Sequence, residues 1–307
     1  MKLSIVIPVY NSESILSELL VQITEKVDFT DDYEIILVND CSPDNSWQIM
    51  KKLTSTYQRL KIINLRKNSG QHNAIMAGLN YSNGDVIIMM DDDLQHSPIY
   101  IKELYNQIKN GYDVCYTKYL NRKHDGWKII GSKFNDAVAN ILLDKPKGLY
   151  MSSFKAIDKS IKDEIIKYDG PYAYVDGLIL SVTNSVTTIP IQHQKRFIGD
   201  SNYNLISLIT LWTKMATSFS VLPLRLATIV GFVISILSFV LGVYFILSKL
   251  FGSYTPDGWT SLIVIILFLG GIQLLSLGII GEYIGRSYLK VNGKKQYIVK
   301  EVLDGGV

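Results

Sequence analysis

Three consecutive carboxylates, Asp91, Asp92 and Asp93, follow the apolar run of residues 86–90, and Gln95 comes two residues later. Neighbouring carboxylates repel one another, so a run of this kind is tolerated on a solvated turn or around a cation. Oxygen atoms are the ligands that Mg²⁺ and Mn²⁺ prefer in proteins. The residue types therefore leave two interpretations open, a charged turn at a strand end or a site for a divalent cation.

Three more polar segments follow apolar runs of strand length. They begin at Pro8, Asn39 and Arg66, after runs near residues 3–8, 34–38 and 61–65. A further strand is expected at 114–117, and helix-like stretches lie near 14–26, 46–57, 72–81 and 99–109. Such alternation predicts an α/β fold with a mostly parallel sheet covered by helices on both faces. Because ligands bind beyond the carboxyl ends of such strands, the four polar segments are expected to converge on one edge.

Two uncharged apolar stretches occupy residues 226–247 and 261–281. Each matches the roughly 20 residues that a helix needs to cross the hydrocarbon layer. Two deeply buried helices of a soluble protein are the alternative, but the stretches are adjacent, similar in length and joined by a short turn-rich segment. The sequence therefore predicts a transmembrane hairpin.

The flanking charges predict the orientation of this hairpin, because Lys and Arg accumulate on the cytoplasmic side. Only Lys249 lies between the stretches, whereas basic residues flank them on both outer sides, at Lys195, Arg196, Lys214, Arg225, Arg286, Lys290, Lys294 and Lys295. Both flanks are thus expected in the cytoplasm. The cysteines Cys41 and Cys115 suggest no disulfide framework, and the N-terminal apolar run lacks a signal-peptide pattern. A net charge of +3 gives no argument for nucleic-acid binding.

The chain resembles family 2 glycosyltransferases of the nucleotide-diphospho-sugar-binding, GT-A type fold. The resemblance rests on SIVIPVYN, ILVNDCSPDNS, RKNSGQHNAIMAGLNYSNGDVIIMMDDDLQHSP, HQKRFIGDSNY and GIIGEYIGRSY, in this order. Within that family it is most similar to polyprenyl-phosphate glycosyltransferases, a group that includes dolichyl-phosphate mannose synthase, bactoprenol glucosyltransferase and the undecaprenyl-phosphate aminoarabinose-type transferases. The resemblance implies an enzyme of the bacterial cytoplasmic membrane, possessing several spans and forming a homo-oligomer, with a tetramer suspected.

The resemblance also implies a donor site. Asp91, Asp93 and Gln95 would bind the nucleotide and a Mg²⁺ or Mn²⁺ ion. The charge of the ion would explain why neighbouring carboxylates are tolerated. Asp40 would face the base or ribose of the nucleotide, and Pro8, Tyr10 and Asn11 would line the same pocket together with Asp91 and Asp93. Asp92 stands in a position that is often small or uncharged in relatives, and it receives no role.

For the acceptor, Arg196 falls in an H-x-x-R-x-x-G-x-S-x-Y element whose arginine meets phosphate in the relatives, and Ser201 belongs to the same element. Asn202 stands where a lysine is common, so Lys195 is a candidate to supply the missing cation. A lipid phosphate is already largely an anion near neutral pH, which makes a strong general base dispensable. Asp176 is the best remaining acid for catalysis, and a helix-surface or capping role is the alternative for it.

These inferences predict residues 1–203 as a cytoplasmic catalytic domain, 204–225 as an interfacial helix with a linker, 226–282 as the hairpin and 283–307 as a cytoplasmic tail. The expected activity is inverting transfer of a sugar, expected from a UDP-sugar, to undecaprenyl phosphate at the cytoplasmic membrane face. A processive polysaccharide synthase would need more spans and a Q-x-x-R-W element, which His193 and Phe197 break. A non-catalytic sugar-nucleotide sensor is the remaining alternative, against which Asp91, Asp93 and Arg196 argue.

Overall fold

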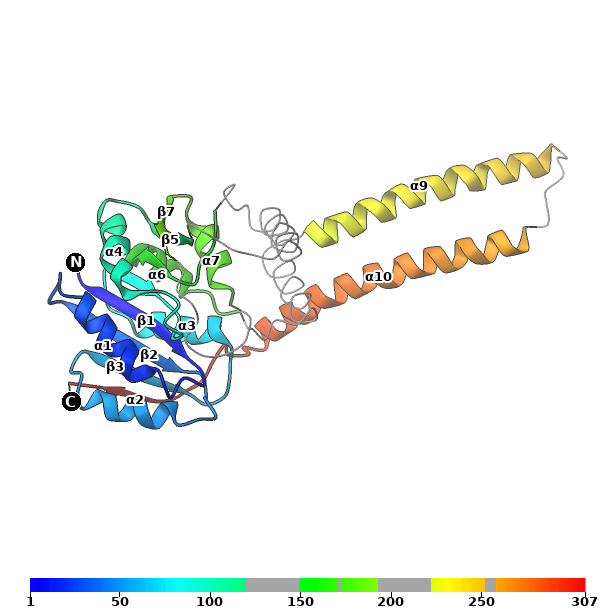
Figure 1. The fold of residues 1–307 in the computed structure, drawn as a ribbon. Helices are drawn as coiled ribbons and strands as arrows, with labels where there is room; N and C mark the ends of the chain where they lie inside the picture. The colour runs from blue at the N-terminus through cyan, green and yellow to red at the C-terminus, as the bar shows by residue number, and fades with distance from the viewer. Residues whose placement is uncertain (120–148, 171–172, 193–221, 252–257, 307) are drawn as a thin grey trace. The chain divides into compact units, whose positions relative to one another are not determined.

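The structure is a computed structural model that describes residues 1–119, 149–170, 173–192, 222–251 and 258–306 (Figure 1). The chain divides into two compact units. Met1–Leu208 and Lys294–Val307 form the first, and Ile209–Gly293 forms the second. The first unit contains the sheet and its helices, and the second contains two long helices.

Four parallel strands form the centre of the sheet. They are β1 (Leu3–Val9), β2 (Tyr33–Asn39), β3 (Leu60–Leu65) and β4 (Val86–Met89), arranged in the order β4-β1-β2-β3. Nearly every residue of these strands is buried, as expected for strands that are covered on both faces. The predicted α/β fold is confirmed, and the first four predicted strands lie within one or two residues of the observed ones.

Four more strands make the complete sheet mixed, in the order β7-β5-β6-β4-β1-β2-β3-β8. They are β5 (Val114–Tyr119), β6 (Lys155–Asp158), β7 (Val186–Ile191) and β8 (Val299–Asp304). Strand β6 pairs antiparallel with both β4 and β5, while β7 pairs parallel with β5. Strand β8, from the predicted tail, pairs antiparallel with β3, so the last residues of the chain complete one edge of the sheet.

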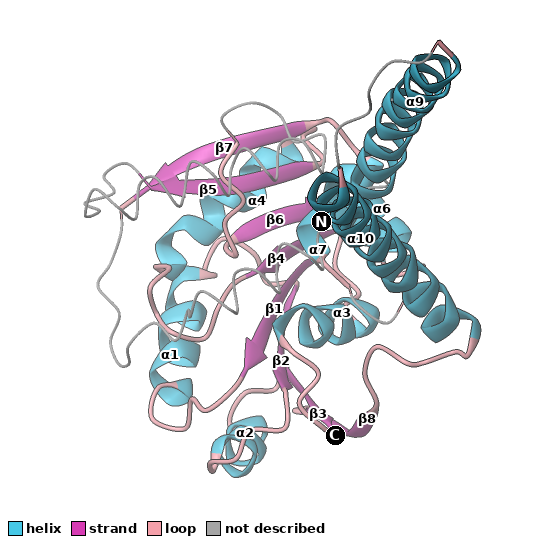
Figure 2. Cartoon of the chain, turned by 90° about the vertical axis from the view of Figure 1, so that its right-hand side faces the viewer, coloured by secondary structure: helices cyan, strands magenta, loops and turns pink. Residues whose placement is uncertain are grey.

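Helices cover both faces of the sheet (Figure 2). Leu3, Ile5 and Ile7 of β1 point to a core shared with α1 (Leu16–Lys26), α2 (Ser46–Thr54) and α4 (Ile101–Lys109), which follows the 3₁₀ turn Pro98–Tyr100. The intervening Val6 faces α3 (Gln71–Tyr81) on the opposite side, where α6 (Lys159–Ile165) and α7 (Val175–Val182) also lie. This alternation is the period of two that a β-strand imposes on its side chains.

The second unit consists of α9 (Leu222–Leu250) and α10 (Trp259–Val291). Both predicted spans lie inside these helices. Among the described residues, Phe268–Val291 is long and apolar enough to cross a membrane, and Ala227–Leu241 is a shorter apolar stretch. The first nine residues of the predicted tail, 283–291, belong to the end of α10 rather than to a separate segment.

Candidate active site at the strand ends

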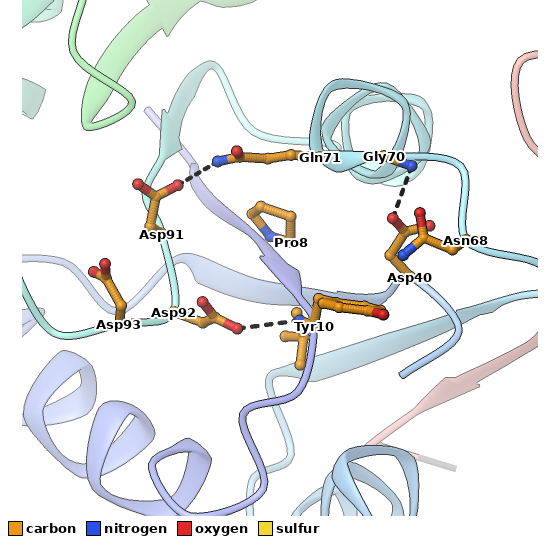
Figure 3. A pocket seen from close by; sticks show the side chains of 10 residues that line it. Pro8, Tyr10, Asp40, Asn68, Gly70, Gln71, Asp91, Asp92 and Asp93 are labelled. Carbon is orange, nitrogen blue, oxygen red and sulfur yellow. Dashed lines mark hydrogen bonds between the residues drawn. The ribbon is translucent and has the colours of Figure 1, made fainter. Parts of the chain in front are cut away.

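A pocket of about 420 Å³ opens beyond the carboxyl ends of the central strands (Figure 3). Its walls come from the last two residues of β1 and from the segments that follow β1, β2, β3 and β4, namely Pro8, Val9, Tyr10, Asp40, Asn68, Gly70, Gln71, Asp91, Asp92 and Asp93. The structure thus brings together Pro8, Tyr10, Asp40, Asp91 and Asp93 from the predicted donor-binding residues. The sixth, Asn11, lies beside the lining, and its backbone N–H donates to Ser42 Oγ at 3.2 Å.

Asp92, for which the sequence predicted no role, accepts hydrogen bonds from the segment after β1. The Tyr10 backbone N–H donates to Asp92 Oδ2 at 3.3 Å, and the Ser12 hydroxyl donates to the same oxygen. Tyr10 lines the pocket and is 52% exposed. Burial raises the pKa of Asp92 to about 6, although both hydrogen bonds oppose this shift. Asp92 therefore places the β1 segment, and with it Tyr10, against the carboxylate run.

Asp40 performs the same task for the segment after β3. Its two carboxylate oxygens accept hydrogen bonds from the backbone N–H groups of Ser69, at 2.7 Å, and Gly70, at 2.8 Å. Burial raises the pKa of Asp40, and the two backbone donors partly offset that effect. Gly70 has a φ of 87°, in the region that favours glycine, and α3 begins at the next residue. Asp40 thus lines the pocket and also fixes the start of α3.

Three non-glycine residues around the pocket have a left-handed backbone. Asn11, Cys41 and Leu94 have φ values of 58°, 56° and 56°, and they lie in the segments after β1, β2 and β4. Such a conformation is uncommon for residues with a side chain and clusters at functional sites. Asn tolerates it best, whereas nothing in the identity of Cys41 or Leu94 signals it in the sequence.

The carboxylates Asp91 and Asp93 have different surroundings. Asp91 accepts a hydrogen bond on each oxygen, from Gln71 Nε2 at 2.6 Å and from Ser153 Oγ at 2.5 Å. Burial raises the pKa of Asp91 most, the Ser153 hydroxyl opposes this shift, and the charge of Asp93 adds to it. Asp93 accepts from the backbone N–H of Gln95 at 3.1 Å, which turns the chain between these two residues.

The donor set fits a hard divalent cation. The side chains of Asp91, Asp93 and Gln95 offer oxygen ligands, and the neighbouring charge of Asp93 helps to raise the pKa of Asp91. In the described part of the chain, no three His, Cys, Asp or Glu side chains form a cluster that could hold a metal ion alone. The residues present therefore suit an ion that takes its remaining ligands from water and from the phosphates of a bound molecule, as Mg²⁺ usually does.

Asp176, the candidate catalytic acid, lies in the first turn of α7 and is absent from the pocket lining. It is buried, forms an ion pair with the Lys155 ammonium, and accepts a hydrogen bond from the Tyr116 hydroxyl at 3.0 Å. The predicted acceptor residues Lys195, Arg196 and Ser201 lie outside the described residues. Residues 204–221 of the predicted interfacial helix and linker also lie outside them.

Sequence reasoning did not find Gln71, Ser153 or Lys155. Gln71 and Ser153 bond directly to Asp91, yet they are 20 and 62 residues away from it along the chain. The pairing of β4 with β6 brings Ser153 and Lys155 to Asp91, and no local pattern announces that pairing.

Parallel central strands with an acidic pocket at their carboxyl ends define an α/β protein of the kind that binds ligands at this edge. Residues 4–170 match glycosyl transferase family 2, and residues 222–287 match the GtrB C-terminal hairpin. The chain belongs to glycosyl transferase family 2, and it is an enzyme of the glycosyltransferase class. The family resemblance inferred from the sequence motifs is confirmed.

Relatives match along almost the whole chain. An undecaprenyl-phosphate 4-deoxy-4-formamido-L-arabinose transferase from Proteus mirabilis is 34% identical over 306 residues, which cover 98% of this chain and 94% of that protein. An uncharacterized glycosyltransferase from Bacillus subtilis is 35% identical over 302 residues, 97% of this chain and 93% of that protein.

Solved structures share the fold at low sequence identity. Glucosyl-3-phosphoglycerate synthase from Mycobacterium tuberculosis in complex with uridine diphosphate has a TM-score of 0.53 at 14% identity, over 71% of this chain and 78% of that one. A structure of the same enzyme with Mn²⁺, UDP-glucose and phosphoglyceric acid has a TM-score of 0.51 at 15% identity, over the same shares of the two chains. These likenesses support the predicted GT-A type fold.

Proposed function

We propose that this enzyme transfers a sugar from a nucleotide-diphospho-sugar, specifically a UDP-sugar, to undecaprenyl phosphate at the cytoplasmic face of the bacterial membrane. One observation carries the donor half of the proposal, the pocket in which Tyr10, Asp40 and the carboxylates Asp91–Asp93 converge. The UDP and Mn²⁺ in the structures of the mycobacterial synthase support the choice of donor and of a divalent cation. The names of the full-length relatives support the acceptor.

The chain's own residues bind and orient the donor in this proposal. The exposed ring of Tyr10 offers a flat apolar face for a nucleobase. Asp40 keeps the segment of Ser69 and Gly70 in place at the pocket wall. Asp93 and Gln95, with Asp91 beside them, would hold a Mg²⁺ or Mn²⁺ ion. Such an ion neutralises negative charge on the leaving diphosphate when it is bound.

The reaction needs no strong general base, because the second pKa of a phosphate monoester is about 6. A phosphate oxygen of the acceptor attacks the anomeric carbon of the sugar. The bond from that carbon to the diphosphate oxygen breaks, and the nucleoside diphosphate leaves with the electron pair. One displacement of this kind inverts the anomeric configuration. Arg196, Lys195 and Ser201 are proposed to hold the acceptor phosphate, since guanidinium and ammonium groups pair with phosphate oxygens.

The membrane part of the proposal rests on the hairpin. The match to the GtrB C-terminal hairpin and the apolar stretches in α9 and α10 support anchoring in the lipid bilayer. Undecaprenyl phosphate carries a long hydrocarbon chain that stays in the bilayer, so a membrane-bound enzyme meets its acceptor without extracting it.

A donor screen tests this proposal. Purified full-length protein in detergent or nanodiscs would receive undecaprenyl phosphate, Mn²⁺ and, one at a time, a panel of UDP-, GDP- and dTDP-sugars. We expect one lipid product that is heavier by a single sugar residue, from a UDP-sugar, with an inverted anomeric configuration by NMR. Products with several sugars would favour the processive synthase, and the absence of a lipid product with every donor would contradict the proposed activity.

A further inference from the structure

A buried ionic network lies behind Asp91, away from the pocket lining. The Lys155 side chain is only 2% exposed, and its ammonium forms an ion pair with the Asp176 carboxylate. The Tyr116 hydroxyl donates to the same carboxylate oxygen, Asp176 Oδ1, at 3.0 Å, and the Lys155 nitrogen lies 5.3 Å from the centre of the Tyr116 ring. Removing one member of such a pair leaves an uncompensated buried charge, which disrupts the surroundings more than removing both.

Strand pairing connects Lys155 to one side of Asp91. In the antiparallel pair of β6 and β4, Lys155 stands opposite Met89. Met89 lies two residues before Asp91 in the sequence. Ser153 precedes Lys155 by two residues, and its hydroxyl donates to Asp91 Oδ2. The position of the start of β6 therefore determines whether Ser153 reaches Asp91.

The start of α7 connects Asp176 to the other side of Asp91. The backbone N–H of Val175 donates to His72 Nδ1 at 3.4 Å, and the His72 ring packs edge-on against Tyr174, with 5.0 Å between ring centres. Burial lowers the pKa of His72 to about 4, so the imidazole is neutral and Nδ1 is able to accept. His72 follows Gln71, whose amide donates to the second oxygen of Asp91.

We propose that Lys155 is a positioning residue for donor binding, which acts by fixing the start of β6 against the start of α7 through its pair with Asp176. Ser153 and Gln71 are then held on the two oxygens of Asp91, which faces the pocket. Asp176 belongs to this network and is not a general base. The inference rests on the proposed function, because it takes Asp91 to be part of the donor site.

The geometry separates this role from acid–base catalysis. A general base must come within hydrogen-bond reach of the proton that it removes, directly or through one water molecule. Asp176 is buried, its Oδ1 already accepts from the Lys155 ammonium and the Tyr116 hydroxyl, and it does not line the pocket. A phosphate acceptor that is already an anion also has no proton for it to remove.

Calorimetric titration of UDP in the presence of Mn²⁺ tests the inference on the full-length protein. The variants are Lys155→Met, Asp176→Asn and the double variant, with Lys167→Met as a control that removes an exposed ion pair with Glu164. We expect Lys155→Met to bind UDP at least about tenfold more weakly than the wild type. The double variant should bind more tightly than Lys155→Met alone, because the pair couples the two substitutions. Lys167→Met should match the wild type.

A gentler variant covers the case in which Lys155→Met does not fold. Tyr116→Phe removes one hydroxyl donor to Asp176 and keeps the ion pair, so we expect a folded protein with a melting temperature lower by a few degrees and measurably weaker UDP binding. Wild-type affinity for UDP in Lys155→Met would overturn this inference and leave the proposed function intact. If Lys155→Met is unfolded, wild-type affinity in Tyr116→Phe would have the same meaning. A wild-type protein that does not bind UDP with Mn²⁺ would instead overturn the proposed donor.

Turnover separates positioning from base catalysis. With undecaprenyl phosphate and the donor that is active in the screen, Asp176→Asn should raise the KM for the donor and keep most of kcat, because an amide oxygen still accepts from Lys155 and Tyr116. A loss of kcat by three orders of magnitude with unchanged UDP affinity would make Asp176 a catalytic residue and overturn the inference.

Discussion

Each of the three neighbouring carboxylates has its own set of contacts. Asp91 accepts from Gln71 and Ser153, Asp92 accepts from the segment after β1, and Asp93 accepts from the backbone of Gln95. The mutual repulsion that makes the run unusual is thus offset partly by hydrogen bonds to the protein. The cation that we propose at Asp91 and Asp93 would offset the rest.

Asp92 offers a first prediction, because it links two walls of the pocket without being a proposed metal ligand. Asp92→Ala removes the acceptor of both the Tyr10 N–H and the Ser12 hydroxyl, so the segment that carries Tyr10 loses its anchor. We expect the KM for the donor to rise by about tenfold, the equivalent of about 1.4 kcal/mol, with a smaller change in kcat. Steady-state kinetics with varied donor would measure this.

Asp92→Asn provides the matched comparison, since its amide oxygen still accepts a hydrogen bond, and it should lie between Asp92→Ala and the wild type. Asp158→Asn, at the N-cap of α6, controls for a general effect of losing a carboxylate. Equal donor KM values in Asp92→Ala and the wild type would show that Asp92 does not place Tyr10.

His72 gives a prediction about pH. Its pKa is about 4 in the folded protein, against an ordinary value of 6.5, mainly because of burial. Between these values the unfolded chain binds a proton that the folded chain does not, so the free energy of unfolding falls as the pH falls from 6.5 to 4. The loss reaches at most about 3 kcal/mol.

Melting temperatures of the wild type and of His72→Asn between pH 8 and pH 4.5 would isolate this contribution, since all other groups titrate in both proteins. Asn can still accept from the Val175 N–H through its Oδ1 atom. We expect the melting temperature of the wild type to fall more steeply below pH 6.5 than that of the variant. Parallel curves would mean that His72 titrates alike in the folded and unfolded chains.

Part of the site could be predicted from the sequence because its residues follow strands of the central sheet directly. Tyr10, Asp40, Asp91 and Asp93 lie just beyond such strands and Pro8 lies at the end of one, and the ends of parallel strands meet at one edge. The contacts of Lys155 and Asp176 could not be predicted in this way. They depend on the antiparallel pairing of β6 with β4 and on the approach of α7 to α3, which local patterns do not encode.

Helix α3 shows how closely the elements around the site are packed. A Cβ atom added at Gly78 would lie 2.3 Å from Cγ1 of Val6 and 3.2 Å from Cγ2 of Val38, so α3 lies against β1 and β2 with no room for a methyl group. The N-terminus of the same helix carries Gln71 and His72. A glycine at this position therefore allows the helix to approach the sheet and brings its first turn to the pocket.

Gly78→Ala is expected to destabilise the fold by about 1–3 kcal/mol, because overpacking must be relieved by moving α3 away from the sheet. The melting temperature should fall by several degrees, and UDP binding should weaken as Gln71 moves. Gly306→Ala is the control, since the nearest atom to its added Cβ is 3.6 Å away, an ordinary contact. A variant Gly78→Ala as stable as the wild type would contradict this description of the α3 packing.

The sequence did not predict β6, β7 or β8, which come after the regular alternation of strands and helices in residues 1–119. Strand β6 has only four residues, and β8 follows a long apolar helix and lies far from β3 in the sequence. Runs of this length are ambiguous without their partners. The central strands, by contrast, could be predicted because their apolar runs alternate regularly with helix-like stretches.

For the whole molecule, β8 constrains the topology that we propose for the membrane-bound chain. Strand β8 follows the second unit in sequence, yet it pairs with β3 in the same sheet as β1, β2 and β4. In the proposed membrane-bound arrangement, the strands that precede α9 and the strand that follows α10 therefore lie on the same side of the membrane, which requires an even number of crossings. Two crossings agree with the matched hairpin and with the basic residues on both flanks.

Reporter fusions would test this topology. We expect a reporter before Met1 and one after Val307 to report the cytoplasm, and one inserted near Ser253 to report the opposite side. The reason is the shared sheet together with the charge distribution. Reporters at Met1 and Val307 on opposite sides of the membrane would contradict the pairing of β8 with β3 in the same chain.

The central claim is that the pocket at Asp91–Asp93 transfers one sugar to undecaprenyl phosphate with the help of a divalent cation. Mass spectrometry of the lipid product formed by the wild type and by Asp93→Asn, with Mn²⁺ or with chelator, tests it most directly. The substitution keeps the size of the side chain and removes its charge. We predict a lipid carrying one sugar from the wild type with Mn²⁺, and yields lower by orders of magnitude in chelator and in the variant. Yields near the wild-type value under either of these conditions would contradict the claim.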